Sequence, residues 1–387
     1  MPYRILIVDD EPDLEQLIRQ KFRKEIRQNE FEFCSAYNGL QALDILQEDK
    51  TIDLVLTDIN MPQMGGLALL KKICEMRNSI LKAVVISAYG DMENIRTAMN
   101  RGAFDFVTKP INFEDLEITI RKCVMEIANL KLALEARTRI IAVQQELDIA
   151  RNIQLSILPQ AKNPFPDRTE FDLSALIIPA REVGGDFYDF FMIDDDHLGF
   201  CIGDVSGKGI PAAIFMAVCK TAIKSIAVKG LPVKDCFIAV NNTLVQESPL
   251  SIFVTAFYGV LNIQTGELEY CNAGHNPTYH INPSGEVNPL INAEGIPLGF
   301  RKDFQYGTQT ISLKEGDTLF FHTDGVDEAM DKEENEFSED RLKAALKQYA
   351  GLDLSKLNQS VLDKVQEFTG GIPQSDDITV MALRYSP

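Results

Sequence analysis

The sequence predicts two folded domains of different class, an α/β domain followed by an α+β domain, joined by a long helix. Three observations support this. Short apolar runs alternate with helical patterns up to about residue 121, a helical stretch nearly free of glycine and proline follows, and strand-like runs with separate helical blocks fill the rest. At 387 residues the chain is also longer than one typical hydrophobic core. We place the domain boundaries at 1–121, 122–160 and 161–387.

The composition favours a soluble protein that does not bind polyanions. Hydrophobic residues make up 45% of the chain, which is enough for sizeable cores, and the formal net charge is -19 at pH 7. Because like charges repel, this charge argues against nucleic acid or an anionic membrane surface as a partner. The seven cysteines are odd in number and form no CxxC pair, as is typical of reduced thiols. No long apolar run opens the chain, so we expect a cytoplasmic protein.

Five apolar runs predict the strands of the first domain: RILIVDD, FEFCSAYNG, IDLVLTDIN, KAVVISAYG and FDFVTKP. Continuous apolar runs indicate strands that are buried on both faces, and the helical segments between them imply right-handed crossovers. The first domain is therefore predicted to be a doubly wound, five-stranded parallel sheet. In such a sheet the functional site lies beyond the C-terminal ends of the strands.

An acidic cluster with a lysine follows from this arrangement. Asp9 and Asp10 end the first predicted strand, Asp58 the third, Ser87 the fourth and Lys109 the fifth. Three carboxylates at one sheet edge repel each other unless a divalent cation joins them, and oxygen ligands suit Mg²⁺. A carboxylate can also attack phosphorus, and lysine and serine can donate hydrogen bonds to the resulting acyl phosphate.

Over residues 3–121 the sequence resembles the receiver domain of two-component response regulators, on the motifs VDDE, LTDINMPQMGG, VISAYGD and VTKP. The resemblance implies that a sensor histidine kinase phosphorylates Asp58. It also implies that Asp9, Asp10 and Asp58, with the main-chain carbonyl of Asn60, bind Mg²⁺.

The same resemblance implies a conformational switch. Ser87 and Lys109 would sense the phosphoryl group, and Phe106 would hold the aromatic switch position. The Lys109–Pro110 peptide bond is expected to be cis.

The helical stretch carries a repeat typical of a coiled coil. Its seam changes phase near the segment RTRIIAV and continues to Pro159, which locally alters the winding of a supercoil. The alternative is one amphipathic helix that packs on its own domain. We favour a helix that pairs in a homodimer, because the seam is longer than one small domain can cover. The seam positions are Leu116, Ile120, Cys123, Ile127, Leu130 and Leu134, then Ile140, Val143, Leu147, Ala150, Gln154 and Ile157.

The loop GDVSGKG, residues 203–209, looks like a phosphate-binding loop but departs from that pattern. A Walker loop requires G-x-x-x-x-G-K followed by serine or threonine. Here the spacing is one residue short, and Gly209 replaces the hydroxyl residue. The preceding strand instead delivers Asp204 to its end, and the glycines allow a sharp turn beside it.

Other aspartates of the second domain occur in similar settings. Asp186 follows two glycines, Asp324 ends a strand before a glycine, and Asp376 and Asp377 immediately precede the last strand. One such aspartate is usually a turn former, but four spaced in this way suggest a shared centre. Carboxylates that bind two hard cations could activate water for hydrolysis without a serine or cysteine nucleophile.

From about residue 147 to 387 the sequence resembles the PPM-type, metal-dependent serine/threonine phosphatases, and within them the bacterial sporulation and stress-response branch. The motifs are ELDIARNIQLSILPQ, REVGGDFYDF, GDVSGKGIPAA, NAGHNP, GIPLG, HTDGVDEA and SDDITV. The resemblance implies two packed antiparallel sheets flanked by helices, and two Mn²⁺ or Mg²⁺ ions at the site.

By position, the resemblance implies a role for each acid. Asp204 would bridge the two ions, Asp324 and Asp376 would hold one of them, and the Val205 carbonyl would hold the other. Asp186 would act through a water molecule bound to the metal, so we count it with the catalytic and metal-binding residues.

Asp377 stands where much of the wider family has asparagine, so we expect it to support the site without binding metal. The sequence shows no clear anchor for the substrate phosphate. Arg181 and Lys208 are candidates, although each could equally be a solvated surface cation. For His275, a structural hydrogen bond is the favoured interpretation over metal ligation, and Asp327 has no assigned role.

Together these features predict a response regulator whose output is protein phosphatase activity. By resemblance, the substrate is an anti-sigma-factor antagonist phosphorylated on serine or threonine. An alternative is a non-catalytic, receiver-controlled adaptor that sequesters a partner. The complete set of aspartates in the second domain disfavours that interpretation, because a non-catalytic site would be expected to lose ligands. The acidic charge and the lack of a basic recognition helix disfavour a DNA-binding regulator.

Overall fold

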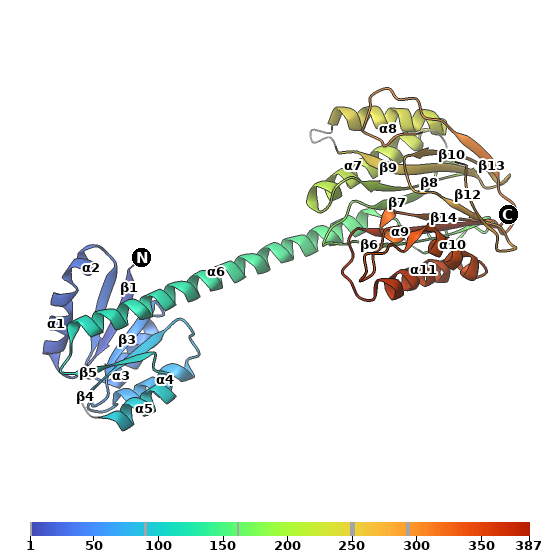
Figure 1. Ribbon diagram of the computed structural model, residues 1–387. Coiled ribbons are helices and arrows are strands. Elements are labelled where there is room, and N and C mark those ends of the chain that lie inside the picture. The colour runs from blue at the N-terminus through green and yellow to red at the C-terminus, as the bar shows by residue number, and fades with distance from the viewer. Residues whose placement is uncertain (1, 89–90, 161, 248–251, 292–294) are drawn as a thin grey trace. The chain divides into compact units, whose positions relative to one another are not determined.

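The computed structural model describes residues 2–88, 91–160, 162–247, 252–291 and 295–387. The chain divides into two compact units, residues 1–143 and 144–387. Both contain a sheet core covered by helices, and one long helix, α6, runs from the first unit into the second (Figure 1).

The first unit is a five-stranded parallel sheet in the order β2-β1-β3-β4-β5, as the sequence predicts. Its strands are β1 (Tyr3–Val8), β2 (Phe31–Ala36), β3 (Ile52–Asp58), β4 (Lys82–Ala88) and β5 (Asp105–Lys109). Its helices are α1 (Pro12–Lys21), α2 (Arg23–Arg27), α3 (Gly39–Glu48), α4 (Gly66–Glu75), α5 (Met92–Asn100) and the start of α6 (Phe113–Ile157).

Both faces of this sheet are buried, which explains the continuous apolar runs of the sequence. Ile5 and Ile7 pack into one core cluster, whereas Leu6 and Val8 pack into another. Successive side chains of a strand point to opposite faces, so each strand supplies both clusters. The central strand β3 is buried along its whole length, and it carries Asp58 to the C-terminal edge of the sheet.

Helix α6 is continuous over 45 residues, including the predicted change of phase. Its first four predicted seam residues, Leu116, Ile120, Cys123 and Ile127, are fully buried in the core of the receiver unit itself. For these four positions, the expectation of a seam that faces a second chain is wrong, because the apolar stripe packs on its own sheet. Further along α6 the apolar side chains become exposed: Leu132, Leu134, Ile140, Ile141, Val143, Ile149 and Ile153.

The second unit contains two antiparallel sheets. The first has the order β13-β10-β9-β8-β7, with β13 (Gln309–Ser312), β10 (Glu267–Ala273), β9 (Val254–Asn262), β8 (His197–Val205) and β7 (Phe187–Met192). The second has the order β12-β11-β14-β15-β6, with β12 (Val287–Pro289), β11 (Tyr279–Ile281), β14 (Thr318–His322), β15 (Ile378–Tyr385) and β6 (Phe171–Ile178).

The two sheets pack on each other through large apolar side chains. Phe200 and Phe257 of the first sheet contact Phe321 of the second, with ring centroids 5.5 and 5.1 Å from it. Helices α7 (Ile210–Ala227) and α8 (Val233–Glu247) contact strands of the first sheet. Helices α9 (Asp324–Asp327), α10 (Ser338–Tyr349) and α11 (Leu354–Thr369) contact strands of the second. This is the α+β arrangement of two packed antiparallel sheets flanked by helices.

Within the described residues, α7 is the one helix long and apolar enough to cross a membrane by length and composition. Its buried residues include Phe215, Met216 and Ile223, and they belong to the core cluster between the sheets and helices. One apolar face of α7 therefore packs in the core, whereas Ile210, Ile214 and Val218 remain exposed.

Candidate functional site

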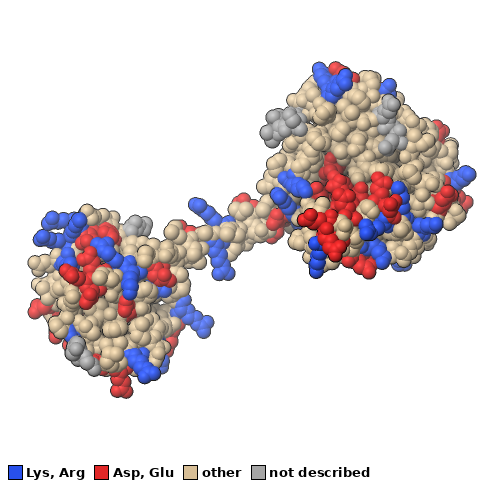
Figure 2. Space-filling view, viewed as in Figure 1, with Lys and Arg blue, Asp and Glu red and all other residues tan. Residues whose placement is uncertain are grey.

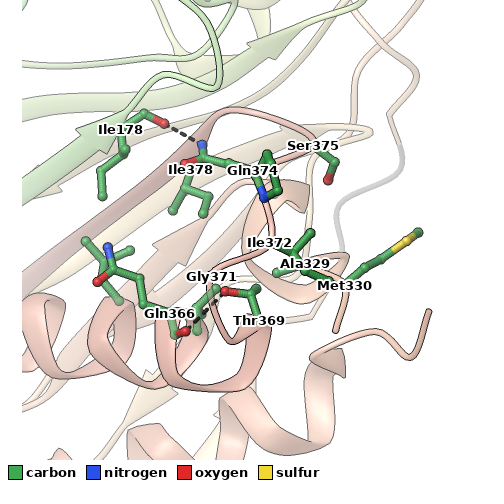
Figure 3. A pocket seen from close by; sticks show the side chains of 14 residues that line it. Ile178, Ala329, Met330, Gln366, Thr369, Gly371, Ile372, Gln374, Ser375 and Ile378 are labelled. Carbon is green, nitrogen blue, oxygen red and sulfur yellow. Dashed lines mark hydrogen bonds between the residues drawn. The ribbon is translucent and has the colours of Figure 1, made fainter. Parts of the chain in front are cut away.

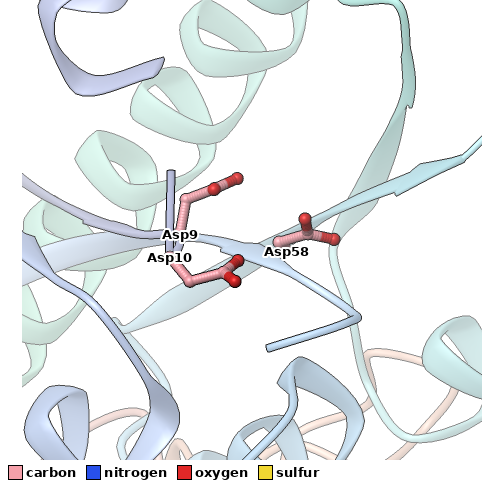
Figure 4. Close-up of side chains that lie close together, drawn as sticks. All are labelled: Asp9, Asp10 and Asp58. Atoms are coloured by element: carbon pink, nitrogen blue, oxygen red, sulfur yellow. The ribbon is translucent and has the colours of Figure 1, made fainter. Parts of the chain in front are cut away.

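At the C-terminal edge of the receiver sheet, three aspartates converge. The side chains of Asp9, Asp10 and Asp58 each place a carboxylate oxygen within 4.8 Å of the others (Figure 4). Asp9 and Asp58 are buried, whereas Asp10 is exposed. Oxygen ligands at this spacing, with one open to solvent, match the coordination that Mg²⁺ prefers, so these residues fit that ion.

Lys109 balances part of this negative charge. Its Nζ lies 2.5 Å from Oδ2 of Asp58 and 3.1 Å from Oδ2 of Asp9. Burial alone would lower the pKa of Lys109, but the hydrogen bonds and charges of these two carboxylates raise it. Burial is the main cause that raises the pKa of Asp9, opposed by its hydrogen bonds to the Glu11 backbone and to Lys109. Lys109 is therefore a cation placed against the predicted phosphorylation site.

Ser87 and Asn60 lie near the same edge, whereas Phe106 is the second residue of β5, three positions before Lys109. The Ser87 hydroxyl is fully buried and has no hydrogen-bond partner among the described residues. Phe106 on β5 has 37% of its surface exposed, and the backbone N–H of Asn60 donates to Asp58. The expected cis bond between Lys109 and Pro110 is present.

The predicted phosphatase residues come from both sheets of the second unit. Asp186 immediately precedes β7, and Asp204 with Val205 ends β8 in the first sheet. Asp324 begins α9 directly after β14, and Asp376 lies just before β15 in the second. Each acid is thus fixed by the end of a strand.

Asp186 is 1% exposed and is held by two threonines. Its Oδ2 accepts hydrogen bonds from the hydroxyls of Thr323, at 2.7 Å, and Thr379, at 2.6 Å. Burial, followed by the charges of Asp204 and Asp377, raises the pKa of Asp186 well above its usual range, and the threonine hydrogen bonds oppose this effect. Sequence reasoning did not identify these threonines. Thr379 lies in β15, where a threonine normally indicates only a β-branched filler, and Thr323 lies between β14 and α9.

The remaining acids repel one another. Burial, then the charges of Asp324 and Asp376, raises the pKa of Asp204 to about 7. Burial, then the charges of Asp376 and Asp327, also raises the pKa of Asp324. Carboxylates crowded in this way are stabilised when a divalent cation offsets their charge, so the oxygen donors present fit hard cations such as Mn²⁺ or Mg²⁺.

The lysine of the GDVSGKG loop contacts this acidic set directly. Lys208 Nζ lies 2.7 Å from Oδ2 of Asp376 and donates to the Ser375 carbonyl at 2.6 Å. Gly207 and Gly209 have φ angles of 93° and 76°, which side chains rarely adopt. The loop therefore carries both Asp204 and Lys208, and each of them interacts with Asp376. Arg181, the other candidate anchor for phosphate, is exposed.

Asp377 holds the backbone in front of Asp186. Its two carboxylate oxygens accept the N–H groups of Ala180, at 2.7 Å, and Gly185, at 2.6 Å. A Cβ on Gly184 would lie 2.3 Å from Asp377, and one on Gly185 would lie 2.8 Å from the Val205 carbonyl oxygen. Both glycines are therefore needed for this close approach, and they bring the backbone before Asp186 against Val205.

Gln154 of α6 is a further residue at this site. Its side-chain amide donates to the Gly184 carbonyl at 2.6 Å and accepts the Gly184 N–H at 3.1 Å. Sequence reasoning placed it only as a seam position. The sequence feature that could have identified Gln154 is that it is a polar residue in an otherwise apolar stripe. In the structure its side chain is 8% exposed.

His275 has the structural role that the sequence favoured. It is buried, its backbone N–H donates to Asn272, and its Nδ1 lies 3.2 Å from the Thr255 hydroxyl. Burial lowers the pKa of His275 to about 3, so the ring is neutral. Asp327 accepts a hydrogen bond from the Asn276 side chain, which gives it a partner next to the site.

Two family models match the chain. The response regulator receiver domain matches residues 5–121, and stage II sporulation protein E (SpoIIE) matches residues 194–386. Phosphoserine phosphatase RsbU from Bacillus subtilis is 29% identical over 246 residues, which covers 62% of this chain and 70% of RsbU. Protein IcfG from Synechocystis sp. is 29% identical over 265 residues, which covers 62% of this chain and 41% of IcfG.

The receiver unit is also similar to sporulation initiation phosphotransferase F from Bacillus subtilis, with 33% identity over 122 residues that cover 32% of this chain and 94% of that protein. Among solved structures, the SiaA-PP2C domain of Pseudomonas aeruginosa superposes with a TM-score of 0.57 at 24% identity and covers 65% of this chain and 99% of that one. This likeness supports the fold of the second unit. The chain therefore belongs to the response regulators through its N-terminal receiver domain and to the SpoIIE branch of the PPM-type phosphatases through its C-terminal domain.

Proposed function

We propose that this protein is a response regulator whose output is metal-dependent dephosphorylation of phosphoserine or phosphothreonine in a protein. The observation that carries the proposal is the complete acidic set at strand ends of both sheets, with Asp186, Asp204, Asp324 and Asp376 at its centre. The relationship to a protein named phosphoserine phosphatase supports the same reaction.

Asp204, Asp324, Asp376 and the Val205 carbonyl would hold the two Mn²⁺ or Mg²⁺ ions. Such ions offset negative charge on phosphoryl oxygens and make water a better nucleophile. The chain's own residues prepare the site: two threonines orient the Asp186 carboxylate, and Lys208 holds Asp376 in place. Preorganised groups of this kind stabilise charge in a transition state without further rearrangement.

In the receiver, Asp58 would attack the phosphoryl group that a sensor histidine kinase supplies. Asp9, Asp10, Asp58 and the Asn60 carbonyl would hold Mg²⁺. Lys109 already contacts Asp58, and the Ser87 hydroxyl at the same edge has no hydrogen-bond partner in the part of the chain that the structure describes, so both are placed to donate to phosphoryl oxygens. Movement of Ser87 and Phe106 would then report phosphorylation to the rest of the chain.

The substrate would be a phosphorylated anti-sigma-factor antagonist, and the protein would act in the cytoplasm without nucleic-acid or membrane partners. A homodimer would form through the exposed part of α6, where Leu134, Ile140 and Val143 each have more than half of their surface open to solvent. Buried against a second copy, such side chains stabilise association.

Hydrolysis of p-nitrophenyl phosphate in Mn²⁺ tests the enzymatic proposal against the adaptor alternative. We expect turnover that EDTA abolishes and that Asp204→Ala lowers by at least a hundredfold. Asp195→Ala is the matched control, because Asp195 is an exposed aspartate in the turn between β7 and β8. Equal turnover by Asp204→Ala and the wild type would refute the proposed mechanism. Repeating the assay with beryllofluoride, an acyl-phosphate mimic, shows the direction of receiver control.

A further inference from the structure

A pocket of about 480 Å³ lies beside the candidate phosphatase site. We call it the side pocket. It is formed by the C-terminal part of α11, the segment that leads into β15, and the segment that follows β14 (Figure 3). Its volume is within the range of roughly 300–1,000 Å³ that is typical of pockets for small molecules and cofactors.

The side pocket shares a wall with the acidic site. Gly325, on the pocket wall, directly follows Asp324, and Ser375, also on the wall, directly precedes Asp376. On both segments, the acid that would lie near a bound phosphate is the direct sequence neighbour of a residue that lines the pocket. Whatever carries that phosphate must extend past the pocket or into it.

The lining of the side pocket is suited to an apolar side chain. Ile178, Ile372, Ile378 and Ala329 supply carbon surface, and Met330, with 43% of its surface exposed, adds a flexible wall. Methionine adapts to different apolar shapes, which is why it is common at binding surfaces.

Two polar side chains of the pocket, Gln374 and Thr369, already make hydrogen bonds within the protein. The Gln374 amide donates to the carbonyls of Ile178 and Asp376, and the Thr369 hydroxyl donates to the Gln366 carbonyl (Figure 3). A ligand that entered the pocket would therefore gain mainly from burial of apolar surface.

The segment that supplies Gly325, Ala329 and Met330 to the pocket is acidic. Between residues 324 and 340 the sequence has nine acidic residues and one lysine. Burial, then the charges of Asp324 and Asp327, raises the pKa of Glu328, which places these acids close together. Figure 2 shows acidic side chains gathered on this domain. An acidic ligand segment would be repelled here, whereas a neutral or basic one would be accepted.

We propose that the side pocket binds an apolar side chain of the phosphorylated substrate segment, from a residue within about three positions of the phosphoserine or phosphothreonine. An extended segment advances by roughly 3.3 Å per residue, so a neighbouring side chain reaches a pocket that begins one residue from the acids. The acidic segment around Glu328 repels substrate segments that carry acidic residues next to the phosphorylated residue. This inference rests on the proposed phosphatase function and adds the substrate's sequence preference to it.

A panel of short phosphoserine peptides tests the inference on the full-length protein. One leucine is moved through the three positions on each side of the phosphoserine in an otherwise alanine and lysine background. We expect leucine at one or two positions to raise kcat/KM about tenfold over the leucine-free peptide. Glutamate in place of the lysines should lower kcat/KM. If no position of leucine changes kcat/KM while p-nitrophenyl phosphate is hydrolysed, the inference is wrong and the proposed function stands. If neither substrate is hydrolysed, both are wrong.

The variant Gln366→Trp tests whether the side pocket causes the preference for leucine. Gln366 is exposed on α11 and lines the pocket, so tryptophan there fills the space without changing the core. We expect loss of the leucine preference with unchanged hydrolysis of p-nitrophenyl phosphate. Gln359→Trp, at an exposed position of the same helix outside the pocket lining, should leave both unchanged. Should Gln366→Trp fail to fold by circular dichroism, Met330→Ala, at an exposed position, must reduce the preference. A preference that survives in the folded variant overturns the assignment.

Discussion

Gln154 of the long helix α6 and Gly184, in the segment that precedes β7, are joined by two hydrogen bonds, in which the side-chain amide of Gln154 pairs with both backbone polar groups of Gly184. Gly184 lies two residues before Asp186. The C-terminal part of the linker helix is therefore attached to the backbone that positions a predicted catalytic carboxylate.

The first prediction concerns this attachment. Gln154→Ala leaves the buried N–H and carbonyl of Gly184 without partners, which costs about 1–3 kcal/mol in the free energy of unfolding. Because the loop loosens, we expect kcat on p-nitrophenyl phosphate to fall about tenfold while KM changes less than threefold. Steady-state kinetics at saturating Mn²⁺ and urea unfolding measure the two effects.

Gln145→Ala is the control for this variant, because Gln145 is an exposed glutamine on the same helix. It should match the wild type in both assays. Wild-type kcat in Gln154→Ala would show that the two hydrogen bonds do not position Asp186.

The second prediction contrasts two neighbouring aspartates. Asp377 accepts two backbone N–H groups, so Asp377→Asn would set an NH₂ group against one of these donors and lower the free energy of unfolding by about 1–3 kcal/mol. Asp376→Asn should instead cost less stability in EDTA, because it removes a charge that opposes those of Asp204 and Asp324 and loses only a half-exposed ion pair with Lys208. Urea unfolding of both variants in EDTA measures the difference. Equal destabilisation by the two substitutions would contradict the separate roles given to them.

The third prediction concerns phosphorylation of the receiver. Asp58→Asn should abolish incorporation of a phosphoryl group from acetyl phosphate, as detected by intact-protein mass spectrometry in Mg²⁺. Asp53→Asn is the matched control, because Asp53 lies on the same strand at its opposite end and pairs with Lys131 at 2.6 Å. It should be phosphorylated like the wild type. Phosphorylation of Asp58→Asn at an equal level would move the site to another residue.

Much of the fold and of the candidate site could be predicted, because both depend on strand ends. Apolar runs in the sequence define the strands, and an aspartate directly after such a run must lie at a sheet edge, as Asp58 and Asp204 do. The short strands β11 and β12 could not be predicted in this way. Each has three residues, which is too few to show a periodicity of two.

The residues that sequence reasoning missed act across long separations. Gln154 contacts a backbone 30 positions away, and Thr379 contacts a side chain 193 positions away. Neither contact has a local pattern. The helical stripe of Leu116 and Ile120 was misassigned for a related reason, since an apolar face looks the same whether its own domain or a second chain covers it.

The last prediction concerns the exposed part of α6. If Ile140 and Val143 pair with a second copy, two charges at these positions will be buried unpaired in the dimer, and association will weaken by several kcal/mol. We expect Ile140→Glu with Val143→Glu to sediment as a monomer at concentrations where the wild type is a dimer.

The control, Arg137→Glu with Arg139→Glu, makes a larger change in charge on the same stretch but removes no apolar surface. Because the receiver core ends before this segment and both Glu positions are solvent-exposed in the single chain, the variant should keep its fold and its phosphorylation by acetyl phosphate. A wild-type protein that sediments as a monomer at all concentrations would show that this apolar surface serves another purpose than dimerisation.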